Sequence, residues 1–253
     1  MSATTATATS AGPGKATFAG ATRVLTSVLA PLEKRALVAM ARRMPARINS
    51  DHLTGLALVA MLGAGLSYWL ASTTPIGLYL AVFCLALNWF GDSLDGTLAR
   101  VRNRQRPRYG FYIDHIVDAF GALFLFVGLG LSSYMSPAVA GVLLIAYLML
   151  TIEVMLATHT LGTFRISYFK MGPTELRILL AIGTLVLLVH PTAVIFGHAF
   201  KLYDVGGVCG AIGPFVTLIV SAVRNTKTLY VAEPIPNGRF VGPNFSSAVQ
   251  DRT

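Results

Sequence analysis

Four aspartates lie within residues 92–118, an arginine-rich stretch of a chain that is otherwise mostly apolar. Asp92 and Asp95 are three residues apart, and Asp114 and Asp118 are four apart. Side chains with these spacings share one face of a helix. The turn between the two pairs is short, so the two helices are expected to be neighbours. The spacing therefore predicts that all four carboxylates face one cavity.

The chemistry of such a cavity follows from its charge. Carboxylates at close quarters repel one another unless cations neutralise them. Oxygen-only ligand sets favour hard divalent ions such as Mg²⁺, Mn²⁺ or Ca²⁺ over zinc, which prefers Cys and His. Four aspartates can hold two such ions, the arrangement that stabilises the attacking and leaving oxygens in phosphoryl displacement. Gly96, Ala99 and Gly110 share the aspartate faces and leave room for a ligand or a facing helix.

Composition indicates that membrane-spanning helices must position this cavity. The 253 residues are 54% hydrophobic and 12% charged, with a mean hydropathy of +0.64, which is too apolar for an ordinary soluble domain. Windows of about 20 apolar residues, the length that crosses roughly 30 Å of hydrocarbon, predict six spans. The windows lie near residues 52–71, 75–99, 113–135, 137–158, 174–196 and 205–223. An aspartate at membrane depth costs about 2.5–3.5 kcal/mol, so four of them must be neutralised.

Basic residues predict the orientation, because Lys and Arg are retained on the cytoplasmic side of a membrane. Of the 20 Lys and Arg residues, all but Lys201 fall in the two terminal segments and in the loops on one side of the predicted spans. Six spans with both termini in the cytoplasm satisfy this asymmetry. If the source is bacterial, the membrane is the inner (plasma) membrane. Topology accounts for the net charge of +9, which gives no reason to infer a nucleic-acid partner.

The chain divides into four predicted parts. Residues 1–20 are rich in Ala, Thr, Ser and Gly and are expected to form a disordered tail, since they lack the charged start and apolar run of a signal peptide. Residues 21–48 combine apolar and basic positions at helical spacing, which predicts a cytoplasmic juxtamembrane amphipathic helix, with a flexible basic linker as the alternative. Residues 49–229 form the six-helix transmembrane catalytic domain, and residues 230–253 form a cytoplasmic tail. The fold class is an all-α integral membrane protein.

The residues around the aspartates match a known pattern. The sequence Asp-x-x-Asp-Gly-x-x-Ala-Arg, nine residues, and then Gly-x-x-x-Asp-x-x-x-Asp resembles the signature of the CDP-alcohol phosphotransferase (phosphatidyltransferase) family. Every signature position is filled, by Asp92, Asp95, Gly96, Ala99, Arg100, Gly110, Asp114 and Asp118. The resemblance implies that a CDP-linked lipid donor transfers its substituted phosphate to an alcohol and releases CMP.

The resemblance also implies roles for the aspartates. Asp92, Asp95 and Asp114 would be the principal ligands of two divalent cations, Mg²⁺ or Mn²⁺, that hold the pyrophosphate of the donor. Asp118 would lie beside the same metals and act as the base that takes the proton from the attacking hydroxyl group. Phosphoryl transfer depends on positioning, metal charge and such a base, so the implied roles agree with the chemistry inferred from the residues.

Donor binding is expected around the small residues of the motif. Gly96 and Ala99 would make room for the cytidine, Arg100 would meet its phosphate, and Gly110 would complete the donor site. The compact body resembles enzymes that use CDP-diacylglycerol as the donor and a small polar alcohol as the acceptor. Serine, glycerol 3-phosphate, inositol 1-phosphate and choline all remain open as acceptors.

Four further residues are candidates for the acceptor site. Arg165, Lys170 and Arg177 lie at the predicted cytoplasmic entrance to the fourth and fifth spans, where basic groups can orient an anionic acceptor or a lipid phosphate. Their alternative roles are topology and helix capping. Glu153 is a carboxylate inside the fourth predicted span, which is a functional candidate by default. Its alternative is pairing with a hydroxyl or backbone group inside the bundle.

Two other functions and one assembly state are left open by the sequence. Aspartates inside a membrane also mark ion pathways, so an ion or metal transporter is an alternative to the enzyme. A family member without activity that binds lipid is the second alternative. Glycines at 206 and 210 form a GxxxG pattern, which fits either a homodimer or packing within one bundle.

Overall fold

The computed structural model describes residues 22–24, 30–161, 163–165 and 173–235, and it is mostly helical. The predicted tail 1–20 and most of the predicted tail 230–253 lie outside the described residues. The helices are α1 (Ala30–Arg43), α2 (Ser50–Leu70), α3 (Ile76–Val101), α4 (Pro107–Leu131), α5 (Pro137–Leu161), α6 (Pro173–Val186) and α7 (Leu202–Ala232). The strands are β1 (Thr22–Val24), β2 (Thr163–Arg165), β3 (Thr192–Ile195) and β4 (His198–Lys201).

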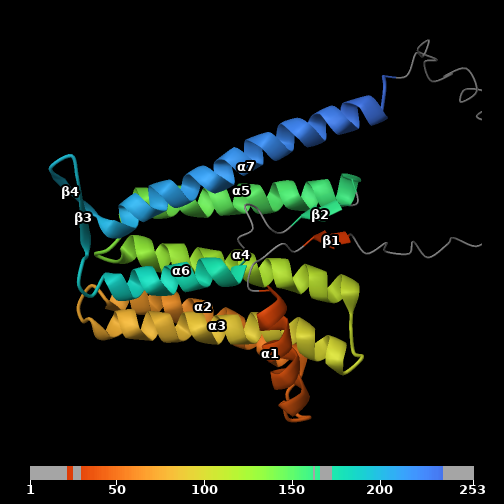
Figure 1. Cartoon of the computed structure of the whole chain (residues 1–253), viewed down its shortest axis with the longest axis horizontal. Coiled ribbons are helices and arrows are strands. Elements are labelled where there is room, and N and C mark those ends of the chain that lie inside the picture. Colours follow the sequence, from red (N-terminus) through yellow and green to blue (C-terminus); the bar gives the residue numbers. More distant parts are fainter. Residues whose placement is uncertain (1–21, 25–29, 162, 166–172, 236–253) are drawn as a thin grey trace, which may run out of the picture.

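Five of these helices, α2, α3, α4, α5 and α7, are long and apolar enough to cross a membrane, judged by length and composition. They correspond to the first four and the sixth of the predicted windows. α4 begins at Pro107, earlier than its window, because proline suits the first position of a helix. α2 to α7 run roughly along one direction in Figure 1. The chain is therefore a multi-pass helical membrane protein.

The predicted fifth window, 174–196, differs from the structure. Its first part forms α6, which has 14 residues and a length of about 21 Å. Helical hydrogen bonding continues to His190, whose N–H donates to the Val186 carbonyl at 2.8 Å. Pro191 disfavours further helix, and β3 then pairs with β4 in an antiparallel hairpin. The apolar run looked continuous because composition alone does not separate a helix from a β-branched strand.

The predicted helix over 21–48 also differs in extent. The structure places a helix at α1, Ala30–Arg43, and a strand at β1, which pairs in parallel with β2. α1 lies across the other helices in Figure 1. Its buried residues Leu37 and Ala41 join a cluster with Leu94 and Leu98 of α3. α1 is therefore packed on the end of α3 that carries the aspartates.

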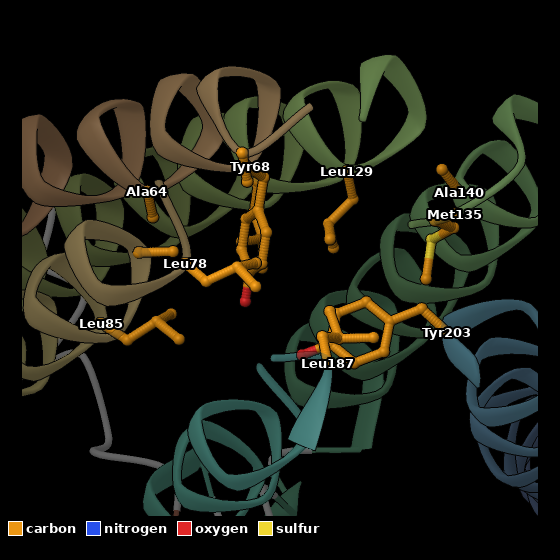
Figure 2. Packing of buried hydrophobic residues seen from close by; sticks show 12 residues of the cluster. Ala64, Tyr68, Leu78, Leu85, Leu129, Met135, Ala140, Leu187 and Tyr203 are labelled. Carbon is orange, nitrogen blue, oxygen red and sulfur yellow. The ribbon is translucent and has the colours of Figure 1, made fainter. Parts of the chain in front are cut away.

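The opposite end of the bundle has its own core, shown in Figure 2. Tyr68 of α2 is fully buried, and its hydroxyl group lies 2.5 Å from the Thr184 hydroxyl of α6. The same Thr184 hydroxyl lies 2.7 Å from the Tyr203 hydroxyl of α7. Close packing of α2 on α4 is set by two glycines, since a Cβ at either Gly65 or Gly128 would overlap the backbone of the other helix.

Candidate active site

The four aspartates lie on two adjacent segments of helix. Asp92 and Asp95 are in the last turns of α3, and Asp114 and Asp118 are in the first turns of α4. All four are half-buried. Asp95 interacts electrostatically with Asp92 and Asp114, and Asp118 interacts with the other three. The structure therefore brings the four carboxylates into one group at the α3–α4 end of the bundle.

Two arginines of the α3–α4 turn bind neighbouring segments beside this group. Arg106, at the end of the α3–α4 turn, forms an ion pair with Asp51 of α2 and lies 4.0 Å from the ring centre of Tyr109. The hydrogen bond that Arg106 donates to the Asp51 carboxylate raises the pKa of Arg106 above its ordinary value. Arg102 donates to the carbonyl oxygens of Met44 and Pro45, at 2.8 and 2.9 Å, just after α1. These two arginines fix the turns that frame the site, a role beyond topology.

Asp95 is held by the first turns of α2. Its Oδ2 accepts a hydrogen bond of 2.6 Å from the Thr54 hydroxyl, and its Oδ1 accepts one from the Gly96 N–H. Its carbonyl oxygen accepts a bond of 2.9 Å from the Ser50 hydroxyl. Neither hydroxyl group could be identified from the sequence, because Thr54 is 41 and Ser50 is 45 positions from Asp95 and nothing local in the sequence links them.

Asp92 is paired with Arg177 of α6. The Arg177 Nη2 donates to Asp92 Oδ2 at 2.7 Å, and the two side chains are 18% and 23% exposed. The other terminal nitrogen, Arg177 Nη1, is buried and has no hydrogen-bond partner within the described part of the chain. A buried donor left unpaired costs about 1–3 kcal/mol. Arg177 Nη1 is therefore available to donate a hydrogen bond to a ligand bound beside the aspartates.

The four aspartates are the candidate metal ligands, and two of them already have hydrogen-bond partners. Among the described residues, no three His, Cys, Asp or Glu side chains are already arranged to hold a metal ion. Asp92 is turned toward Arg177, and Asp95 toward Thr54. The donor set consists of carboxylate oxygens, which fits a hard divalent cation. Arg177 contacts only Oδ2 of Asp92, and each carboxylate has about four lone-pair sites, so these hydrogen bonds leave acceptor capacity for a cation.

The small residues of the motif border the group. A Cβ at Gly96 would lie 3.4 Å from Nη1 of Arg100, so this glycine leaves space for the guanidinium group. The Arg100 Nη2 also donates to the Thr97 hydroxyl at 2.9 Å. Ala99 is half-buried, and a Cβ at Gly110 would meet no atom within 4 Å in the described structure. Open space therefore adjoins the start of α4.

Only one of the predicted acceptor residues contacts the four aspartates in the described structure. Arg177 pairs with Asp92, Arg165 belongs to β2, and Lys170 falls outside the described residues. Glu153 of α5 faces α7, where its Oε1 accepts hydrogen bonds of 2.7 Å from Ser221 and Asn225. Its Oε2 is buried without a partner in the described residues. The sequence could not name these partners, and the acceptor role of Glu153 stays a prediction.

Tyr147 is a further neighbour that the sequence analysis did not select. It lies on α5 and interacts electrostatically with Asp118, Arg177 and Asp92. A single tyrosine in an apolar span carries no signal in the sequence that separates it from a packing residue. The site is therefore formed by side chains of α2, α3, α4, α5 and α6.

Comparison with known proteins gives one family match and one similar fold of particular interest. The family model described as CDP-alcohol phosphatidyltransferase matches residues 48–219, which include all four aspartates. The chain resembles the crystal structure of the phosphatidylinositol phosphate synthase of Mycobacterium tuberculosis with CDP-DAG bound. The TM-score is 0.54 and the identity 18%, over 82% of this chain and 100% of that chain. A search of curated proteins gave no match. At this identity the structural likeness shows the fold alone.

Proposed function

The chain belongs to the CDP-alcohol phosphatidyltransferase family, and from this premise we propose that it transfers a phosphatidyl group from CDP-diacylglycerol to the hydroxyl group of a small polar alcohol and releases CMP. The observation that carries the proposal is the group formed by Asp92, Asp95, Asp114 and Asp118 at the meeting of α3 and α4. The choice of donor is supported by the similar structure, which was determined with CDP-DAG bound.

Divalent cations are part of the proposal, because the family uses them. Two ions, Mg²⁺ or Mn²⁺, would be held by the four aspartates. When bound, they would supply positive charge to the donor pyrophosphate and to the oxygens that enter and leave. Four carboxylates in a membrane protein need such charge, and Arg177, which pairs with Asp92, supplies one positive charge of it.

The reaction assigns a separate role to Asp118. The acceptor hydroxyl oxygen forms a bond to the phosphorus that carries diacylglycerol, and the bond from this phosphorus to the bridging oxygen breaks. CMP leaves with the electron pair of that bond. Asp118 takes the hydroxyl proton as the base, a step that needs a carboxylate within reach of the nucleophile. Gly96, Ala99, Arg100 and Gly110 would bind the donor.

Acceptor binding is proposed at Arg177, with Arg165, Lys170 and Glu153 as further members. Support for Arg177 comes from its Nη1, a buried donor that has no partner in the described residues and that a phosphate or carboxylate oxygen would satisfy. Arg165 and Lys170 precede α6 in the chain, and Glu153 lies on α5. An anionic acceptor would suit the basic members of this set.

Replacing Arg177 with Ala is expected to raise the KM of an anionic acceptor by about tenfold, the size of one charged hydrogen bond, and the KM of the donor by less. Initial rates at varied acceptor and donor concentrations measure the two values. Arg108→Ala, at an exposed position of α4, is the matched control. If the KM values of acceptor and donor rise equally, Arg177 does not bind the acceptor and its role is to pair with Asp92.

The proposed topology has six spans, with α6 as the fifth, α1 at the cytoplasmic surface of the membrane and both termini in the cytoplasm. The distribution of basic residues supports it. A homodimer also remains a proposal. Gly210 lies near Leu143 of α5, whereas a Cβ at Gly206 would meet nothing within 4 Å in the described structure, so part of the GxxxG face is open.

The deciding experiment mixes detergent-purified protein with CDP-diacylglycerol and Mg²⁺ or Mn²⁺ and adds candidate alcohols one at a time. Mass spectrometry measures CMP and the lipid product. Metal-dependent CMP release with one acceptor would establish the reaction and name the substrate. Folded protein that releases no CMP with any acceptor would contradict the proposed donor, and metal counterflow in liposomes would then favour the transporter.

A further inference from the structure

One carboxylate outside the four-aspartate group connects three helices next to it. Glu33 is half-buried in the first turn of α1. Its Oε1 accepts hydrogen bonds from Trp89 Nε1 at 2.8 Å, from the Ser93 hydroxyl at 3.3 Å and from the Thr174 hydroxyl at 2.7 Å. Trp89 and Ser93 belong to α3, and Thr174 belongs to α6. A single oxygen atom thus ties α1 to both helices.

The donors to Glu33 are adjacent to the ion pair in the active site. Ser93 directly follows Asp92 on α3. Thr174 precedes Arg177 by three residues on α6, a spacing that places the two side chains on one face of the helix. The Glu33 contacts therefore act on the same two helical turns that bring Arg177 within 2.7 Å of Asp92.

α6 is a short helix with polar contacts at both ends, and Leu180 and Ala181 in its second half also pack against the apolar core. At the far end, Thr184 is hydrogen-bonded to Tyr68 and Tyr203. At the end that carries Arg177, Thr174 is hydrogen-bonded to Glu33. A hydrogen bond to an ionised carboxylate is about twice as strong as one between neutral groups. Loss of the Glu33 carboxylate would therefore free the first turn of α6 while the far end stays held.

We propose that Glu33 is a positioning residue, which holds the first turn of α6 against α3 so that Arg177 meets Asp92 and presents its second nitrogen to the acceptor. The inference rests on the proposed function for the role of Arg177 toward the acceptor. The placement of α6 by Glu33 is independent of that function. A carboxylate fits the position, because it accepts several donors and lies in the first turn of α1, where negative charge is favourable.

Three variants test the inference in assays of acceptor and donor kinetics. Glu33→Ala is expected to raise the acceptor KM by about tenfold, because Arg177 would be misplaced. The kcat and the donor KM should change much less. Glu33→Gln keeps a carbonyl oxygen at the position and should rescue part of the loss, because a neutral acceptor makes weaker hydrogen bonds than a carboxylate. Lys34→Ala, exposed on the same helix, is the matched control. Equal rises in both KM values, or no rescue by Gln, would overturn the inference.

A double variant separates positioning from general stability. If Glu33 acts through Arg177, Glu33→Ala should add nothing to the acceptor KM of Arg177→Ala, because the misplaced group is already gone. If the two effects multiply, Glu33 does not act through Arg177 and the inference is wrong.

Hydrogen–deuterium exchange tests the placement of α6 without any assay of activity. In Glu33→Ala, backbone amides in the first turns of α6 should exchange faster, while those near Thr184 should keep their protection. Exchange that rises evenly along the bundle, or does not change in α6, would overturn the inference. If the unmodified protein shows no transfer with any acceptor, the proposed function fails and the exchange result alone decides the role of Glu33.

Discussion

An Asp118→Asn variant is expected to keep donor and metal binding and to lose about 10²–10⁴-fold in kcat, the usual contribution of a general base. Asn preserves the shape of the side chain but cannot accept the proton of the attacking hydroxyl group. Asp118 interacts electrostatically with the other three aspartates and with Arg177, so it lies within the group that would hold the donor. Rates of CMP release at saturating donor and acceptor measure the loss.

The matched control for this variant is Asp204→Asn. Asp204 is an aspartate of α7 that accepts a hydrogen bond of 2.6 Å from the Ser136 N–H, and its neighbour Tyr203 belongs to the core at the opposite end of the bundle, so the kcat of this variant should stay near that of the unmodified protein. Calorimetric titration with CDP-diacylglycerol separates binding from turnover. An unchanged kcat in Asp118→Asn would exclude Asp118 as the base. Lost metal binding would instead assign Asp118 mainly to metal ligation.

Removal of divalent cations is expected to abolish CMP release. Metal charge contributes several kcal/mol to the transition state of phosphoryl transfer, which corresponds to at least about 10³-fold in rate. A chelator should therefore stop the reaction, and added Mg²⁺ or Mn²⁺ should restore it. Asp95→Ala should lower the rate similarly and weaken Mn²⁺ binding measured by electron paramagnetic resonance. Release that continues in metal-free solution would contradict the proposed metal site.

Thr54→Val supplies the control for the metal experiment. It removes the hydroxyl group that donates to Asp95 at 2.6 Å but leaves the carboxylate in place. Mn²⁺ binding should therefore persist in Thr54→Val and fail in Asp95→Ala. If both variants lose metal equally, a general disturbance of the α2–α3 contact explains the loss better than the loss of a ligand.

Much of the fold was predictable because membrane spans are local features of a sequence. A run of about 20 apolar residues is sufficient to identify a candidate span, and α2, α3, α4, α5 and α7 follow from such runs. The same reasoning failed at residues 187–196, the end of the fifth predicted window, where the structure has a turn and then β3, the first strand of the β3–β4 hairpin. It also placed a helix over 21–48 where the structure has β1 and a helix from Ala30.

The sequence by itself determined the aspartate pairs, since spacings of three and four residues on two helices joined by a short turn leave few ways to arrange Asp92, Asp95, Asp114 and Asp118. Only the tertiary structure decided their partners. Arg177 is 85 residues from Asp92, and Thr174 is 141 residues from Glu33. Helical periodicity fixes which side chains share a face of one helix. Contacts between helices depend on how whole helices pack, which no local spacing encodes.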